Sequence, residues 1–127
     1  MNHKIKFRAW DTDSVAYVEA GFDVRIDGEG YVYRRIWGES IWGRCSNLEI
    51  EFYTDKTDKN GKEIYAADIL RDTTDDIGLV YWNENVAGFY CKWGDGSDMP
   101  LNTGVATDKC ELISNIHENP ELMEQLQ

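Results

Sequence analysis

The sequence contains few cysteines, and their spacing suits neither a metal site nor a disulfide framework. Cys45, Cys91 and Cys110 are odd in number and form no CxxC pair. Structural zinc sites use closely spaced ligand pairs, and disulfide-stabilised secreted domains use an even set of cysteines. We therefore expect free, buried thiols in a reducing cytoplasm and no bound metal.

Long hydrophobic runs are absent as well. No stretch approaches the roughly 18 apolar residues that a membrane-spanning helix needs, and residues 1–10 lack the apolar segment of a signal peptide. These absences predict a soluble protein that stays in the cytoplasm and does not contact a membrane.

Basic residues are outnumbered by acidic ones. The chain has 13 Lys and Arg against 24 Asp and Glu, and its net charge is −11. Most of the excess lies from Arg71 onward, where 11 acidic residues stand against 3 basic ones. A protein that neutralises nucleic-acid phosphates needs clustered cations. The charge therefore disfavours nucleic-acid binding unless a local basic patch overrides it, and we interpret most of the acidity as a solvated surface.

Common catalytic signatures are missing too. The sequence has no Gly-x-Ser-x-Gly, His-Glu-x-x-His, phosphate-loop or dinucleotide-binding motif. We interpret His3 and His117 as structural or solvated, and 24 carboxylates are too many for proximity alone to indicate an active site. We expect no catalytic residue, no cofactor and no enzymatic activity; an enzyme is the least supported alternative.

One segment resembles a calcium loop only in part. If Gly61 takes the sixth position of an EF-hand loop, Asp58 and Asn60 occupy acceptable ligand positions. Lys56 and Ala67 then stand at the first and twelfth positions, where carboxylates are required. We therefore do not expect this segment to bind calcium.

What the sequence does have is the composition of one folded, β-rich domain. It is 42% hydrophobic and 13% aromatic, with 11 Gly and only 2 Pro in 127 residues. Asp11–Ser14 and Asp27–Gly30 carry turn residues between alternating segments and predict two hairpins. Strands are predicted at Ile5–Trp10, Val15–Val18, Phe22–Ile26, Tyr31–Ile36, Leu48–Tyr53, Ile69–Asp72, Leu79–Trp82, Gly88–Trp93 and Cys110–Ile113. Residues 37–46 receive no assignment, and residues 95–107 are predicted to be a long polar loop.

The clearest strand pattern lies just before the most charged segment. Residues 48–53 alternate with a period of two, which predicts that Leu48, Ile50 and Phe52 are buried and that the residues between them are exposed. Residues 54–59 are then predicted to form a charged loop. Asn60 and Gly61 are expected to supply the positive φ angles of a tight turn.

Only the end of the chain has a helical pattern. Asn119 suits a helix N-cap, and Pro120 suits the first helical position. Leu122, Met123 and Leu126 then form a short apolar stripe. We predict a helix of about two turns that docks on the sheet.

The chain has five tryptophans, of which two are candidates for exposure. Trp37 and Trp42 flank a glycine-rich turn, whereas tryptophans on alternating strands belong more often to the core. Because tryptophan is enriched at protein interfaces, these two suggest a protein contact.

Three motifs in this order resemble those of a known family, the YopX-like proteins of phages and prophages. They are FRAWD at residues 7–11, YTDKTDKNGKEIYAADIL at residues 53–70 and NIHENPEL at residues 115–122, supported by GLVYW and Gly88-Phe89. The matching residues are candidates for structure or partner binding: Phe7, Arg8, Trp10, Asp11, Asp58, Asn60, Gly61, Lys62, Glu63, Ile64, Tyr65, Asp68, Asn115, Glu118, Asn119 and Pro120.

The resemblance implies an all-β fold with a short C-terminal helix. It implies N-terminal β-hairpins in residues 1–53, a small SH3-like barrel in residues 54–127, and a phage-encoded protein in the cytoplasm of a bacterial host. No catalytic activity comes with it.

Two departures from the family pattern concern glycines. The family usually has Tyr-Thr-Gly-Leu where this chain has Asp55 and Lys56 after Tyr53-Thr54, and Glu-Gly where it has Ala66-Ala67. Alanine disfavours positive φ, so the second departure argues against that backbone conformation just before Asp68. The resemblance does not explain residues 40–47.

Two functional hypotheses follow. The first is a non-enzymatic protein-interaction or assembly module, with self-association favoured by strand edges and aromatic residues that need covering. The alternative is a nucleic-acid-associated regulator that uses basic residues of the first half, provided that several share one face. These are Lys4, Lys6, Arg8, Arg25, Arg34, Arg35 and Arg44.

Overall fold

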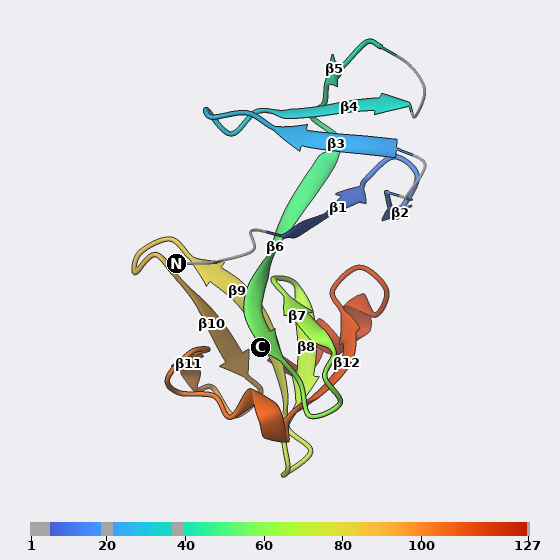
Figure 1. Ribbon diagram of the computed structural model, residues 1–127. Coiled ribbons are helices and arrows are strands. Elements are labelled where there is room, and N and C mark those ends of the chain that lie inside the picture. Colours follow the sequence, from blue (N-terminus) through green and yellow to red (C-terminus); the bar gives the residue numbers. More distant parts are fainter. Residues whose placement is uncertain (1–5, 19–21, 37–39, 127) are drawn as a thin grey trace. The chain divides into compact units, whose positions relative to one another are not determined.

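The computed structural model describes residues 6–18, 22–36 and 40–126. It is mainly β, as the sequence predicts, and the described residues include no helix long and apolar enough to cross a bilayer. The chain divides into two compact units, which we describe separately (Figure 1). The N-terminal unit spans Phe7–Glu51, and the C-terminal unit contains Lys6 and the chain from Phe52 onward.

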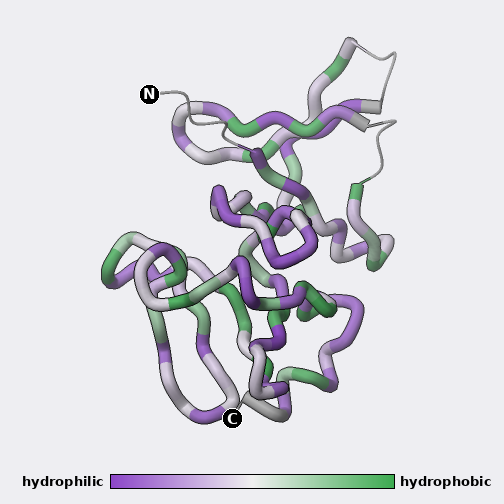
Figure 2. Tube along the Cα trace, turned by 60° about the horizontal axis from the view of Figure 1, so that its bottom comes forward, coloured by the Kyte–Doolittle hydropathy of each residue, from purple (hydrophilic) through white to green (hydrophobic). Residues whose placement is uncertain are grey.

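Short antiparallel strands build the N-terminal unit. They are β1 (Phe7–Asp11), β2 (Ala16–Tyr17), β3 (Phe22–Ile26), β4 (Val32–Ile36), β5 (Gly43–Arg44) and the first part of β6 (Leu48–Thr57). Both predicted hairpins are present: β1 pairs with β2, and β3 pairs with β4. The turn before β4 forms because the Asp27 carboxylate accepts the amides of Glu29 and Tyr31, while Gly30 has a φ of 90°. Apolar and polar residues alternate along β3 (Figure 2), whereas β4 has the consecutive polar residues Tyr33, Arg34 and Arg35.

A five-stranded sheet, in the order β11-β10-β9-β8-β12, curls into a half-barrel and dominates the C-terminal unit. After β6, the C-terminal unit contains the elements β7 (Glu63–Tyr65), β8 (Asp68–Arg71), β9 (Ile77–Asn83), β10 (Gly88–Trp93), β11 (Asp98–Pro100), η1 (Thr107–Lys109), β12 (Glu111–Asn115) and η2 (Pro120–Leu126). Strand β7 pairs separately with the second part of β6. The predicted loop at residues 95–107 is therefore wrong in part, since β11 pairs with β10 and η1 begins at Thr107.

Neighbouring residues of β8 pack into separate cores on opposite faces of the sheet. Leu70 is fully buried in a cluster with Val80, Cys91 and other apolar residues. Ile69, also fully buried, packs with Ile77 in a second cluster. Complete burial of one such aliphatic side chain stabilises the fold by about 2 kcal/mol. Successive residues of a strand point to opposite faces, and here both faces are buried. A shift of β8 by one residue would exchange the two faces, so the burial fixes its pairing register.

The predicted C-terminal helix is corrected to a 3-10 helix, η2. Asn119 precedes it, and its side chain contacts Ser114 and Glu121. Leu122 and Met123 pack against the second core cluster, while the side chain of Leu126 lies outside the described part. Helix η2 docks on the sheet through these two residues.

Strand β6 differs from its prediction in length and in burial. It continues to Thr57, so the predicted loop at residues 54–59 is mostly strand. The strict alternation is wrong, because Glu51 is buried at 5% exposure and Phe52 is 41% exposed. The register of β6 with β7 shifts between Tyr53 and Thr57, where Asp55 has a φ of 69°. A bulge of this kind changes which side chains face the core.

Candidate functional site

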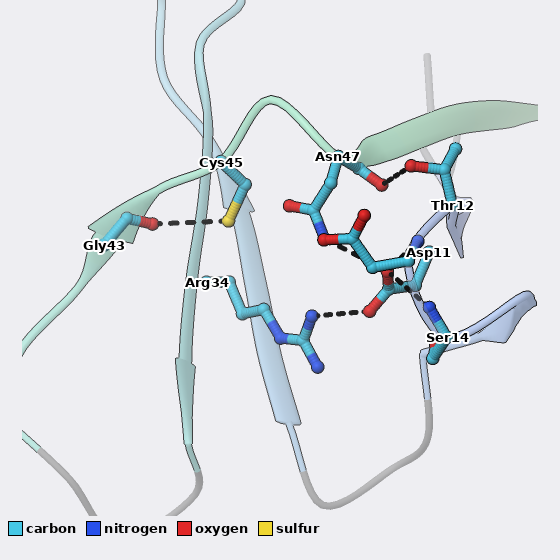
Figure 3. A network of polar contacts seen from close by, with 8 residues as sticks. Asp11, Thr12, Ser14, Arg34, Gly43, Cys45 and Asn47 are labelled. Carbon is cyan, nitrogen blue, oxygen red and sulfur yellow. Dashed lines mark hydrogen bonds and ion pairs between the residues drawn. The ribbon is translucent and has the colours of Figure 1, made fainter.

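The first family motif forms a polar network within the N-terminal unit (Figure 3). Asp11 is buried, at 5% exposure. It accepts hydrogen bonds from Arg34 at 2.8 Å, from Asn47 at 3.0 Å and from the amides of Asp13 and Ser14. The Arg34 guanidinium is the main cause that lowers the pKa of Asp11 to about 2. Asp11 therefore ties β1 to β4 and to the segment before β6.

A second buried carboxylate explains the unexpected burial on β6. Glu51 accepts a hydrogen bond from Arg8 Nε at 2.7 Å and from the Tyr17 hydroxyl at 2.9 Å. The Arg8 guanidinium also lies over the Tyr17 ring, and Tyr17 packs edge-on against Trp10. Because the carboxylate has a cation and a hydroxyl as partners, its burial is compensated.

The central motif is a turn held by one carboxylate. Asp58, 4% exposed, accepts the amides of Asn60 and Lys62 on one oxygen and the amide of Leu112 on the other. Burial alone would raise the pKa of Asp58, but these amide donors lower it below its ordinary value. Gly61 has a φ of 78°, whereas Asn60 does not share the positive φ predicted for it. The Asp58 side chain therefore links the turn to β12.

The other residues of the three motifs also make contacts within the fold. Asp68, 1% exposed, accepts the Tyr65 amide at 2.7 Å and so bonds backbone. Asn115 pairs with Asp68 across the sheet and accepts the amides of His117 and Glu118. Of the remaining motif residues, Phe7 is half-buried, Ile64 is fully buried, Glu63 pairs with Lys6 at 2.5 Å and Pro120 begins η2.

Ala67 keeps a conformation that its side chain disfavours. Its φ is 79°, which contradicts the expectation from the missing glycine. The Ala67 amide donates to the Val80 carbonyl at 2.8 Å, and its carbonyl accepts from Ile116 at 3.0 Å. These two backbone bonds hold the residue between β9 and the turn after β12.

A different set of residues forms a charged, partly exposed surface on the sheet β3-β4-β5. Directly paired residues of antiparallel strands point to the same face. Arg25 pairs with Tyr33, and Tyr33 pairs with Arg44. Arg35 lies two residues beyond Tyr33 on β4 and therefore shares this face. Tyr31 and Trp42 complete it, and we call the six residues the arginine–aromatic face.

Each guanidinium on this face lies over an aromatic ring. The distance from Cζ to the ring centroid is 4.0 Å for Arg25 over Trp42 and 4.8 Å for Arg35 over Trp42. For Arg44 over Tyr31 it is 3.6 Å. Such contacts contribute about 0.5–1 kcal/mol each at exposed sites and restrict the side chains. The guanidinium groups are therefore held close to the surface of the sheet.

An open pocket of about 280 Å³ lies on this face. Arg25, Asp27, Tyr33 and Trp42 line it. The Tyr33 hydroxyl donates to Asp27 at 3.1 Å, and this hydrogen bond is the main cause that raises the pKa of Tyr33. The pocket thus has a fixed phenol, a fixed carboxylate and a guanidinium along its wall.

Two of the three arginines lack a carboxylate partner. Arg35 is bound to Asp23 at 2.8 Å. No ion pair within the described ranges includes Arg25 or Arg44, and both side chains are exposed. A guanidinium presents five N–H donors, so both residues retain donors for an anionic group.

The sequence identified only part of this surface. Trp42 was a candidate for exposure and is half-buried beside two arginines, whereas His3, Lys4 and Trp37 lie outside the described residues. Arg8 and Arg34 are bound to buried carboxylates and do not join it. Tyr31 and Tyr33 were missed, although their spacing of two with Arg35 was a usable signal.

Comparisons with known proteins identify the relatives of this chain. The family described as YopX protein matches residues 6–124. The crystal structure of protein EF1440 from Enterococcus faecalis aligns with a TM-score of 0.65 and 23% identity, covering 96% of this chain and 99% of that one. The X-ray structure of protein yopX from Bacillus subtilis aligns with a TM-score of 0.63 and 20% identity, covering 91% and 95%. No curated protein matches the chain.

Proposed function

The chain belongs to the YopX family, and we propose that this member is a non-enzymatic interaction module that binds an acidic protein surface through its arginine–aromatic face. One observation carries the proposal: Arg25 and Arg44 are held over aromatic rings while no described ion pair neutralises them. A cation that is already positioned loses less conformational freedom when it binds a carboxylate. A phage origin and a cytoplasmic location are part of the same proposal.

The buried ionisable groups support a role without catalysis. Asp11, Glu51, Asp58 and Asp68 all accept hydrogen bonds from cations, a hydroxyl or backbone amides. In the described part of the chain, no buried side-chain nitrogen or oxygen lacks a partner. Burial raises the pKa of the Cys91 thiol, which opposes formation of a nucleophilic thiolate.

A protein partner fits the surroundings of the face better than a nucleic acid. Asp23 and Asp27 lie among the arginines. The unpaired cations of the face are therefore two separate guanidinium groups, which suit individual carboxylates of a protein, and not the continuous basic row that binds a line of phosphates. Ile41, beside Trp42, is 77% exposed, and such a side chain adds apolar area to a protein contact.

Binding of a fluorescently labelled peptide rich in Asp and Glu tests the proposal. We expect binding that weakens with added salt, and a loss of affinity of about tenfold or more in the double variant Arg25→Gln, Arg44→Gln. The matched control is Lys92→Gln with Lys109→Gln, which removes two exposed cations from the C-terminal unit. Equal affinity of both double variants for the peptide would contradict the proposal.

Single-stranded nucleic acid is the second candidate. One observation favours it, because rings next to guanidinium groups resemble the stacking surfaces on which bases bind. A labelled oligonucleotide in the same assay separates the candidates. If the oligonucleotide binds, the arginine variant loses it and the acidic peptide does not bind, the nucleic-acid function replaces the protein-binding one.

A further inference from the structure

The C-terminal unit carries a surface whose charge is opposite to that of the arginine–aromatic face. Asp72, Asp75, Asp76 and Asp95 lie in the turns after β8 and after β10. The two turns are joined, because the Asp95 amide donates to the Asp76 carboxylate at 3.2 Å. We call these four residues the acidic loops.

Hydrogen bonds hold the carboxylates of Asp72, Asp76 and Asp95 without neutralising them. Asp72 accepts the amides of Thr74 and Asp76, and Asp95 accepts the amide and hydroxyl of Ser97. A carboxylate has about four acceptor positions, so each retains capacity for a further donor.

The described ion pairs leave all four carboxylates without a cation within bonding distance. Arg71 acts electrostatically on Asp75, but its guanidinium is bound to Glu111 at 2.9 Å. Asp75 and Asp95 are exposed. The acidic loops therefore form a fixed negative surface, as the arginine–aromatic face forms a fixed positive one.

We infer that the partner of the arginine–aromatic face is the acidic loops of a second copy of this chain. The inference rests on the proposed function and names the acidic surface that it requires. Every copy carries two guanidinium groups without carboxylates on one unit, and four carboxylates without cations on the other. Complementary patches of this kind attract each other in solution and fix the register of a contact.

This contact joins two different surfaces, so each copy can take part in two such contacts. When each of two copies binds the other through both surfaces, the contacts close into a two-fold dimer; otherwise they continue into larger rings or open filaments. In either case the protein is expected to self-associate.

Two neutralising variants separate the two surfaces. Arg25→Gln with Arg44→Gln removes the two unpaired cations and keeps the acidic loops. Asp75→Asn with Asp95→Asn removes the two exposed carboxylates of the acidic loops and keeps the arginine–aromatic face. Asparagine retains the local hydrogen bonds of aspartate and tolerates the φ of 66° at position 75. The control is Lys92→Gln with Glu84→Gln, which changes one exposed residue of each sign. Thermal melting confirms that all variants fold.

Sedimentation velocity over a concentration series reads out the assembly. We expect wild type and the control to grow with concentration at low salt and to dissociate as salt rises. Each neutralised variant alone should associate at least about tenfold more weakly. An equimolar mixture of the two variants should form a heterodimer and nothing larger, because only one complementary pair of surfaces remains.

Several outcomes would overturn the inference. The first is a wild type that stays monomeric at every concentration. The second is a mixture of the two variants that does not dimerise. The third is an oligonucleotide that binds the arginine–aromatic face of a monomer. If the wild type stays monomeric but the arginine face still binds the labelled acidic peptide, the proposed function survives and only the second copy is rejected.

Discussion

Replacing Ala67 with glycine should stabilise the protein, although glycine usually weakens a fold. Ala67 has a φ of 79° and is held there by backbone hydrogen bonds to Val80 and Ile116. The left-handed conformation costs a non-glycine residue about 1–2 kcal/mol, and glycine adopts it freely. Against this gain stand the larger entropy of glycine in the unfolded chain and the loss of a half-buried methyl group, together about 1 kcal/mol.

The expected net effect is a gain of about 0.5 kcal/mol in the free energy of unfolding, or about 2 °C in Tm for a chain of this length. Ala66→Gly is the matched control, because Ala66 is also half-buried but has no positive φ. Ala66→Gly has the same entropy and burial costs but relieves no backbone strain. Its free energy of unfolding should therefore fall by about 1 kcal/mol. Urea unfolding followed by tryptophan fluorescence measures both. If Ala67→Gly were no more stable than Ala66→Gly, the assignment of strain to position 67 would be wrong.

Three further substitutions and one pH titration test the structural contacts. Gly78→Ala should destabilise the fold by about 1–3 kcal/mol in urea unfolding, because its Cβ would lie 2.5 Å from the Cys91 sulfur; an unchanged midpoint would exclude this close packing. Asp58→Ala should cost about 3 kcal/mol in the same assay, since it leaves three amides without their acceptor, and a loss below 1 kcal/mol would show that water replaces it. Gly61→Val should lower Tm by several degrees, because a β-branched residue disfavours the φ of 78°; a wild-type Tm with a lost partner contact would make the turn a binding site. Because the pKa of Asp11 is lowered to about 2 from 3.8, its stabilising effect is present above about pH 4 and is lost as pH falls towards 2; an NMR titration that finds an ordinary pKa would contradict the network.

The sequence predicts elements whose signals are local. The two N-terminal hairpins follow from turn residues such as Asp27 and Gly30 and from short alternating segments. The burial pattern predicted for β6 was wrong because the burial of Glu51 depends on hydrogen bonds from Arg8 and Tyr17, both more than thirty residues away in the sequence. Partners brought in by tertiary pairing override local alternation.

The candidate surface was predictable only in part for the same reason. Arg25 and Tyr33 become neighbours once the β3–β4 register is known, and the turn signal indicates that hairpin. Trp42 and Arg44 could not be placed, because residues 37–46 have no clear pattern and β5 is only two residues long. Pairing with β4 brings these two side chains onto the face.

The most direct test of the central claim follows the indole N–H of Trp42 by NMR. The peptide rich in Asp and Glu is titrated into isotopically labelled protein at low salt, with Trp42→Phe used to assign the signal. Because Arg25 and Arg35 lie over this ring, the account predicts that the Trp42 signal shifts and that the indole signals of Trp10 and Trp93, which are buried, stay in place. A Trp42 signal that does not move while the peptide binds would contradict the account.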